Sequence, residues 1–91
     1  MTTTYVIQKL RHPSIDPHAE DRYTWVEAFG LTEKSWPKAA SDDEAIEQFT
    51  VCAARARTPR RLIKFIGGGY GCRIAVLSTA HIPPPPETKD R

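Results

Sequence analysis

Four glycines and a tyrosine separate two apolar runs in the segment FIGGGYGCRIAVL, residues 65–77. Glycine-rich loops can bind phosphate groups through their backbone amides, so known phosphate-binding patterns are the first comparison. A Walker loop needs a lysine and a hydroxyl residue after its last glycine, and neither follows Gly71. A dinucleotide fingerprint leads from a strand into a helix, whereas β-favouring residues flank this segment on both sides. The segment therefore predicts a hairpin turn, with a backbone anion nest or a partner-facing loop that displays Tyr70 as alternatives.

The histidines and cysteines lack the spacing of a metal site. His12 and His18 are in one proline-containing segment, and Cys52 and Cys72 are twenty residues apart. Structural zinc sites use pairs such as C-x-x-C or H-x-x-x-H, which are missing from this sequence. Cys52 also falls in an apolar helical stripe, where a small buried thiol is common. We therefore expect no metal, no cofactor and no catalytic residue, and we expect both cysteines to be free thiols.

Basic residues concentrate in the second half of the chain. Residues 48–86 contain six basic residues and no acidic one, whereas residues 12–47 contain nine acidic and three basic residues. Arg55, Arg57, Arg60 and Arg61 surround the end of a predicted helix, and Lys64 follows in the next strand. Such a cluster suits the phosphate backbone of nucleic acid, the acidic surface of a protein, or the dipole of the helix itself. The sequence leaves these interpretations open.

The acidic half of the chain offers a second candidate surface. Asp16, Glu20 and Asp21 are in a proline-containing loop, and acidic residues continue as far as Glu47. If a crevice of a partner normally holds nucleic acid, an acidic face could occupy it by imitating phosphate charge. These three residues therefore join the basic cluster and Tyr70 as candidate partner-binding residues, and the sequence does not decide which face binds.

The pattern of apolar residues predicts five elements. β-Branched and aromatic residues predict strands over 4–11, 23–29, 60–66 and 72–78. A helix is predicted over 41–58, because Ser41 and Glu44 form a capping box and Pro59 ends the helical region. The order β-β-α-β-β indicates an α+β fold with two layers: a mainly antiparallel four-stranded sheet and one helix on one face.

Side-chain periodicity predicts how these elements pack. The helix carries an apolar stripe at i, i+3 and i+4 spacing that includes Ile46, Phe49 and Ala53. Its expected contacts in the sheet are Ile7, Trp25, Ile63 or Phe65, and Ile74 or Val76. Tyr23, Trp25 and Phe29 are expected on one face of the second strand. The last two strands are apolar on both faces, so we expect their hairpin at the centre of the sheet.

Length and composition indicate a single domain. Charged residues make up 26% and apolar residues 40% of the 91-residue chain, which is typical of globular proteins and not of disordered ones. Residues 1–82 are predicted to form the domain, and 83–91 a proline-rich disordered tail. The tail contains P-x-x-P, a minimal ligand of SH3-type grooves, but a chain terminator is the favoured interpretation. No apolar run approaches the ~20 residues of a membrane span, and no secretory leader is visible, so a cytoplasmic protein is expected.

The arrangement as a whole resembles a known class of small proteins. A first strand (TYVIQKLR), a second strand, a capped helix (SDDEAIEQF) and a closing hairpin resemble small phage-encoded inhibitors of the anti-CRISPR type. The resemblance covers most of the chain as architecture and includes no diagnostic motif, so it assigns no role to any residue. It implies a small non-enzymatic module that inhibits a host defence complex by occupying a partner's surface. The alternative is a nucleic-acid-binding module that uses the arginine cluster.

Overall fold

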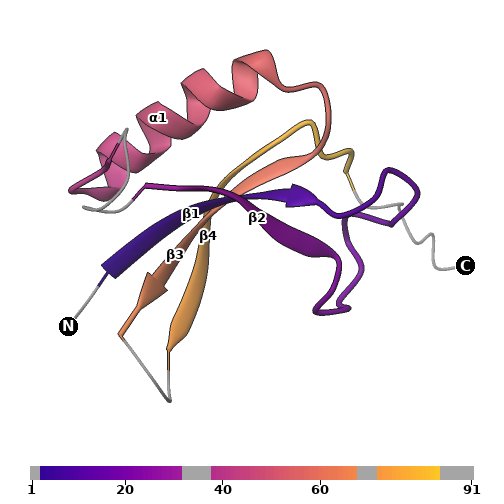
Figure 1. Ribbon diagram of the computed structural model, residues 1–91, viewed down its shortest axis with the longest axis horizontal. Helices are drawn as coiled ribbons and strands as arrows, with labels where there is room; N and C mark the ends of the chain where they lie inside the picture. Colours follow the sequence, from indigo (N-terminus) through magenta and orange to yellow (C-terminus); the bar gives the residue numbers. More distant parts are fainter. Residues whose placement is uncertain (1–2, 32–37, 68–71, 85–91) are drawn as a thin grey trace, which may run out of the picture.

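The computed structural model describes residues 3–31, 38–67 and 72–84 of the chain. The elements are β1 (Thr3–Leu10), β2 (Trp25–Gly30), α1 (Asp42–Arg55), β3 (Arg60–Ile66) and β4 (Arg73–Ala80). The strands form one antiparallel sheet in the order β2-β1-β3-β4, and α1 lies across one face of it (Figure 1). The predicted α+β fold with two layers is confirmed.

The positions of the strands correct one expectation. The hairpin of β3 and β4 was expected at the centre, but β1 and β3 are the central strands and β4 is an edge strand. β1 pairs with β3 over seven residues, from Thr3 opposite Ile66 to Lys9 opposite Arg60. Among the described residues, no strand pairs with the other side of β4. Apolar residues on both faces of β4 therefore do not reflect a central position.

The connection between β3 and β4 joins two antiparallel strands, as the glycine-rich segment predicted. Ile66 is opposite Arg73 at the end of this pair. Gly67 has a φ of 94°, a left-handed conformation that glycine adopts without steric cost. Residues 68–71 lie outside the described residues. They include Tyr70, so the display of this tyrosine to a partner stays a prediction.

Helix α1 begins with a modified capping box. Ser41 Oγ accepts a hydrogen bond from the Glu44 backbone amide at 3.3 Å. Glu44 Oε2 in turn accepts from the backbone amide of Ala40 at 2.8 Å, one residue before the position that the usual pattern engages. The helix ends at Arg55, three residues earlier than predicted, because Ala56 is already extended (φ −88°, ψ 151°). His81 Nε2 donates to the carbonyl of Ala53 at 2.9 Å and satisfies one acceptor of the last turn.

The hydrophobic core lies between α1 and one face of the sheet. Phe49 and Ala53 are buried in it as predicted, together with Ala45. The sheet contributes residues on alternate positions of β1 and β3, namely Tyr5, Ile7 and Leu62. Leu31 and Ala39, on either side of the undescribed residues 32–37, complete the buried cluster.

Two parts of the predicted core are wrong. Ile46 is 36% exposed, since it lies at the margin of the apolar stripe of α1 and not on its buried centre. Ile63 alternates with the core residue Leu62, so its side chain is on the opposite face of the sheet. Val76 is directly opposite Ile63 in the register and shares that face. The predicted helix contacts with Trp25, with Ile63 or Phe65, and with Ile74 or Val76 are therefore wrong, because all of these side chains lie on the face of the sheet opposite the helix.

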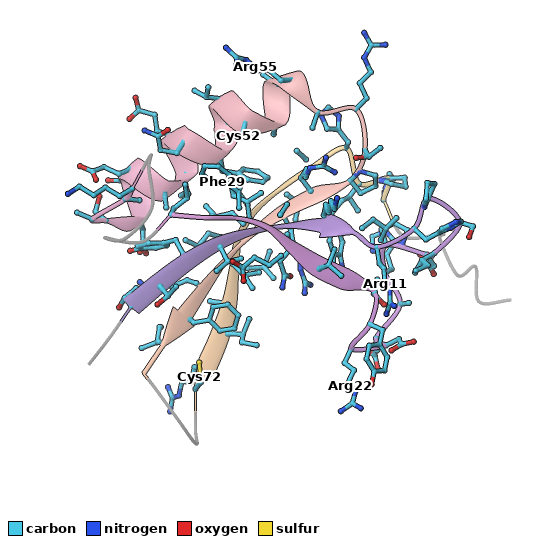
Figure 2. The ribbon with its side chains drawn as sticks, in the orientation of Figure 1. Arg11, Arg22, Phe29, Cys52, Arg55 and Cys72 are labelled. Atoms are coloured by element: carbon cyan, nitrogen blue, oxygen red, sulfur yellow. The ribbon has the colours of Figure 1, made fainter. Side chains whose placement is uncertain are left out.

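A β-bulge explains why the second strand departs from simple alternation. The register between β1 and β2 shifts between Ile7 and Gln8, so that Phe29 is opposite Ile7 while Glu27 is opposite Gln8. The extra residue, Ala28, reverses the alternation and sends Trp25 and Phe29 to opposite faces. Phe29 lies on the helix side of the sheet (Figure 2). The prediction that these two aromatics share a face is wrong for this reason.

A polar contact joins the start of α1 to the sheet. Lys64 Nζ lies 2.8 Å from Asp42 Oδ1, and the Tyr5 hydroxyl donates to the same oxygen at 2.6 Å. The lysine, and then the tyrosine, hold the pKa of Asp42 below its usual value. Burial, reinforced by the hydrogen bond to Asp42, raises the pKa of Tyr5 to about 12, so the phenol remains a donor throughout the neutral range. This contact fixes the N-terminal turn of the helix over β1 and β3.

Truncation of the central core residue should cost much of the stability. Phe49 is 2% exposed, so Phe49→Ala should lower the free energy of unfolding by about 3–5 kcal/mol. Val51→Ala is the control on the same helix, because Val51 is 54% exposed and its loss should change stability by less than about 0.5 kcal/mol. Chemical denaturation of both variants measures the difference. Equal midpoints would show that the buried stripe of α1 is misassigned.

The contact at Asp42 should make stability depend on pH. Because its pKa is lowered by folding, the carboxylate stabilises the protein above its unfolded pKa of about 3.9, and this contribution is lost as the pH falls through the folded pKa. Asp42→Asn should therefore lower the melting temperature at pH 7 and have little effect at pH 2. Asp43→Asn is a matched control in the same helical turn, since it shares the helix dipole. An equal loss in both variants at pH 7 would contradict a specific role for the contact with Lys64 and Tyr5.

Candidate partner-binding face

The face of the sheet that α1 does not cover is here called the open face. Cross-strand register places its side chains in rows that run across the sheet. A polar row contains Thr79, Arg61, Gln8 and Glu27. A neighbouring apolar row contains Val76, Ile63 and Val6, and the next row toward the hairpin contains Ile74 and Phe65.

The apolar rows expose large side chains on the edge strand. Ile74 is 62% exposed and Val76 is 53% exposed, whereas Ile63 beside them is 1% exposed. Phe65 is half-buried. Contiguous exposed apolar side chains on a small domain are typical of an interaction surface. Because β4 is also an edge strand, its outer backbone groups lie next to this apolar surface.

Arg61 stands at the centre of the polar row. Its Nε donates to Gln8 Oε1 at 2.7 Å, and its guanidinium carbon lies 4.8 Å from the centre of the Trp25 ring. Arg61 is half-buried, and this burial lowers the pKa of its guanidinium. The side chain is therefore held in place by both a hydrogen bond and an aromatic surface.

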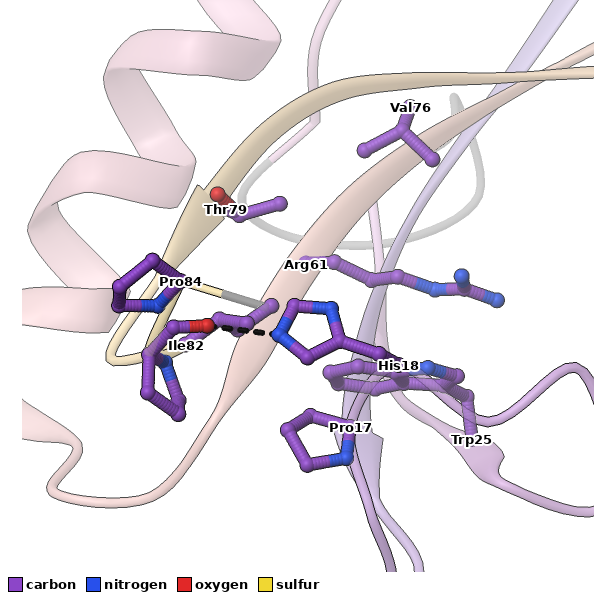
Figure 3. Close-up of a pocket in the computed structure, with 9 residues that line it drawn as sticks. Pro17, His18, Trp25, Arg61, Val76, Thr79, Ile82 and Pro84 are labelled. Atoms are coloured by element: carbon purple, nitrogen blue, oxygen red, sulfur yellow. Dashed lines mark hydrogen bonds between the residues drawn. The ribbon is translucent and has the colours of Figure 1, made fainter. Parts of the chain in front are cut away.

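The loop between β1 and β2 meets the C-terminal segment beside this row. His18 Nε2 donates to the carbonyl of Pro83 at 2.6 Å. Pro83 and Pro84 line a pocket with Trp25 and Arg61 (Figure 3). Pro83 and Pro84, the first two residues of the predicted tail over 83–91, lie against the domain in this way. Residues 85–91 are outside the described residues.

The arginine cluster predicted from the sequence is divided by the fold. Arg55 and Arg57 are exposed at the end of α1. Arg60 turns back to donate to Thr58 Oγ1 and to the carbonyl of Pro59, on the helix side of the sheet. Arg61 is on the open face, and Lys64 is paired with Asp42 at the other end of α1. Adjacent strand residues point to opposite faces, which is why proximity in sequence did not produce a single patch.

A different pair of arginines gathers on an aromatic ring. Arg11 and Arg22 approach the exposed ring of Tyr23, with guanidinium carbons 5.8 Å and 4.8 Å from its centre. Arg22 also donates to the Tyr23 hydroxyl at 2.7 Å. Figure 2 shows this pair beside the loop, well separated from Arg55 at the end of α1. The sequence analysis missed this group, although Arg22 and Tyr23 are neighbours in the chain.

The acidic residues also fall into two groups. Asp16, Glu20 and Asp21 belong to the loop after β1, whereas Asp42, Asp43 and Glu44 form the first turn of the helix, at the opposite end of the molecule (Figure 1). Asp16 Oδ1 accepts from the His18 amide at 2.9 Å, and Asp21 Oδ1 accepts from the Tyr23 amide at 2.8 Å. These two carboxylates therefore stabilise turns of the loop. A continuous acidic face from Asp16 to Glu47 is not formed.

The thiols and imidazoles do not gather. Cys52 is half-buried on α1, Cys72 is exposed before β4, and both are free. Among the residues that the structure describes, no three histidine, cysteine or acidic side chains come together in an arrangement that could hold a metal ion. Within the same residues, no helix has the length and apolar character needed to cross a membrane.

The sequence and the structure were compared with known proteins. No protein-family model matches the chain, no curated protein matches its sequence, and no solved structure matches its fold.

Proposed function

We propose that this protein is a small non-enzymatic binding module that acts by occupying the surface of a partner protein. The exposure of Ile74 and Val76 on the open face is the observation that carries the proposal. Both side chains stand on an edge strand, so a partner that covers them also reaches the free backbone groups of β4. Apolar contacts would then supply affinity, and strand pairing would fix the orientation.

A more specific form of the proposal concerns the kind of partner. The architectural resemblance to inhibitors of the anti-CRISPR type suggests a host defence complex that handles nucleic acid. The exposed acids at the start of α1, which include Asp43 and Glu47, are suited to contact a basic groove of such a complex. In this form the open face supplies the main contact, and the acidic helix start accelerates association.

A matched pair of valines tests the proposed surface. Val76 on the open face and Val51 on α1 are 53% and 54% exposed, so Val76→Lys and Val51→Lys remove equal apolar area from different faces. Val76→Lys should weaken binding to the captured partner about tenfold or more, as expected for a hot-spot side chain, and Val51→Lys should leave it unchanged. Binding is measured after capture from a host lysate and purification of the captured protein. Equal affinities of the two variants would contradict the assignment of the open face.

Nucleic-acid binding is the second candidate, and one observation favours it. Arg11 and Arg22 on the Tyr23 ring combine positive charge with an exposed aromatic surface, a pairing that single-stranded nucleic acid can use. Against it, the arginines of the predicted cluster lie on different faces of the molecule. The phosphate contacts available to one duplex are therefore few.

The salt dependence of DNA binding separates the two candidates. A contact made by Arg55 and Arg57 alone engages about two phosphates, so log affinity should fall with log salt with a slope no steeper than about −2. We expect weak duplex binding of this kind, measured by fluorescence anisotropy between 50 and 200 mM salt (about the range in which such slopes are resolved). A slope of about −3 to −4 that Arg60→Ala with Arg61→Ala reduces by about two would instead establish the undivided cluster as a nucleic-acid site.

A further inference from the structure

A pocket of about 370 Å³ lies at the end of the polar row on the open face. Its lining includes Trp25, Arg61, Val76 and Thr79 from the sheet, and Ile82 and Pro83 from the segment after β4. Figure 3 shows Arg61 extending across the pocket, with Trp25 beneath it and the His18 contact to Pro83 at one side. A volume of this size holds one or two amino-acid side chains or a small molecule.

The guanidinium of Arg61 has N–H donors that form no hydrogen bond with the described residues. Gln8 engages Nε at 2.7 Å, which removes the side of the guanidinium that combines Nε with one Nη. Among the described residues, no acceptor bonds to either Nη atom. The end of the guanidinium therefore retains a pair of parallel donors, the arrangement that binds both oxygens of a carboxylate.

Among the described residues, no acidic side chain forms an ion pair with Arg61. Within the part of the chain that the structure describes, the one ion pair joins Lys64 to Asp42 on the other face of the sheet. Glu27 occupies the same row as Arg61, but Gln8 stands between them in the register. A half-buried cation without a partner is held at a desolvation cost, which an anionic ligand would offset.

The walls of the pocket limit the kind of anion. Trp25, Val76, Ile82 and Pro83 present apolar surface, Thr79 adds one hydroxyl, and the His18 imidazole is engaged with the Pro83 carbonyl. A strongly hydrated anion such as free phosphate would have to give up water against these walls without compensation. A carboxylate attached to an apolar body satisfies both the cation and the walls.

The position of the pocket points to a segment of a partner protein as the source of that carboxylate. Val76 and Thr79 belong to edge strand β4, and Val76 is also part of the exposed apolar surface. An extended segment paired with β4 would project alternate side chains over the open face, toward Val76 and toward Arg61.

We infer that the Arg61–Trp25 pocket receives the carboxylate of an acidic residue in an extended segment of the partner, with an apolar residue two positions before or after it. This inference rests on the proposed function, because it names the chemistry that the open face recognises. Charge complementarity with Arg61 selects the acidic residue, and the exposed Ile74 and Val76 select the apolar residue that shares its face.

Short peptides test the inference directly on the intact protein. The probe is acetyl-Val-Thr-Glu-Thr-Val-amide, in which both valines project to the same side of an extended chain as the glutamate, and its control is acetyl-Val-Thr-Gln-Thr-Val-amide, which has the same shape without the charge. In ¹H–¹⁵N spectra, the glutamate peptide should shift the Trp25 indole and Arg61 Nε signals saturably, with a Kd on the order of 1 mM. The two indole signals of the chain are assigned with a Trp36→Phe variant. The glutamine peptide should bind at least tenfold more weakly. Equal binding of both peptides, or no binding of either, overturns the inference.

Adjacent arginines supply the matched variants. Arg61→Gln should weaken binding of the glutamate peptide at least tenfold, whereas Arg60→Gln, one residue away on the other face, should not. Inorganic phosphate is titrated as a third probe. If phosphate shifts the same signals as strongly as the peptide, the pocket is a general anion site, and the assignment to a partner's acidic residue is wrong.

The outcomes for the pocket and for the proposed function can be told apart. If the glutamate peptide fails to bind but Val76→Lys still weakens partner binding, the open face is an interaction surface and the pocket inference is wrong. If the peptide binds through Arg61 but Val76→Lys leaves partner binding unchanged, the pocket assignment holds and the proposed use of the open face fails.

Discussion

In the part of the chain that the structure describes, a single helix packs against a sheet of four strands, and the sheet is wider than the helix. This difference in width determines how the rest of the molecule is arranged. A helix is about 10 Å across with its side chains, while four strands spaced about 4.8 Å apart span roughly 14 Å. Helix α1 lies closest to β3 and β4 on one face of the sheet, where Tyr5, Ile7 and Leu62 share a buried cluster with Phe49. Among the described residues, no second layer of secondary structure covers the opposite face (Figure 1). The apolar residues on that face are therefore shielded from water only by loops and neighbouring side chains, or remain exposed.

Two features cover part of the apolar surface on the open face. At one end of the open face, the loop after β1 and the segment after β4 close over Trp25, tied together by His18 and Pro83. In the middle, the long side chain of Arg61 lies over Trp25 and bonds Gln8, so that its aliphatic part covers apolar surface. Toward the hairpin, Ile74 and Val76 remain exposed. On the open face, the exposed apolar side chains of Ile74 and Val76 thus lie next to the free edge of β4.

The charged residues take different roles on the two faces. On the helix side, Lys64 and Asp42 neutralise each other and fix the start of α1. On the open face, Arg61 is held in place by neutral groups and keeps its charge. A charge that is fixed but not neutralised can bind a ligand without reorganisation of the side chain. For this reason the polar row is more informative about function than the more numerous exposed arginines.

The sequence by itself determined the elements and the class of fold. Strand β3 over residues 60–66 and the capped start of α1 at Ser41 followed from local patterns, because β-propensity and capping depend on residues close in the chain. The antiparallel connection of β3 to β4, which begins at Gly67 with its left-handed φ, followed from the glycine-rich segment for the same reason. The buried positions of Phe49 and Ala53 followed from helical periodicity.

Tertiary structure alone decided which face of the sheet each side chain occupies and which residues it contacts. The bulge at Ala28 placed Phe29 and Trp25 on opposite faces of the sheet. The alternation of residues in β2 does not indicate where the register shifts. Strand order placed β4 at the edge, so its apolar residues became a surface and not a core. The same alternation sent Arg60 and Arg61 to opposite sides, and only long-range pairing brought Gln8 and Trp25 to Arg61. These contacts join residues far apart in the chain, and their geometry depends on register, which a local sequence pattern does not specify.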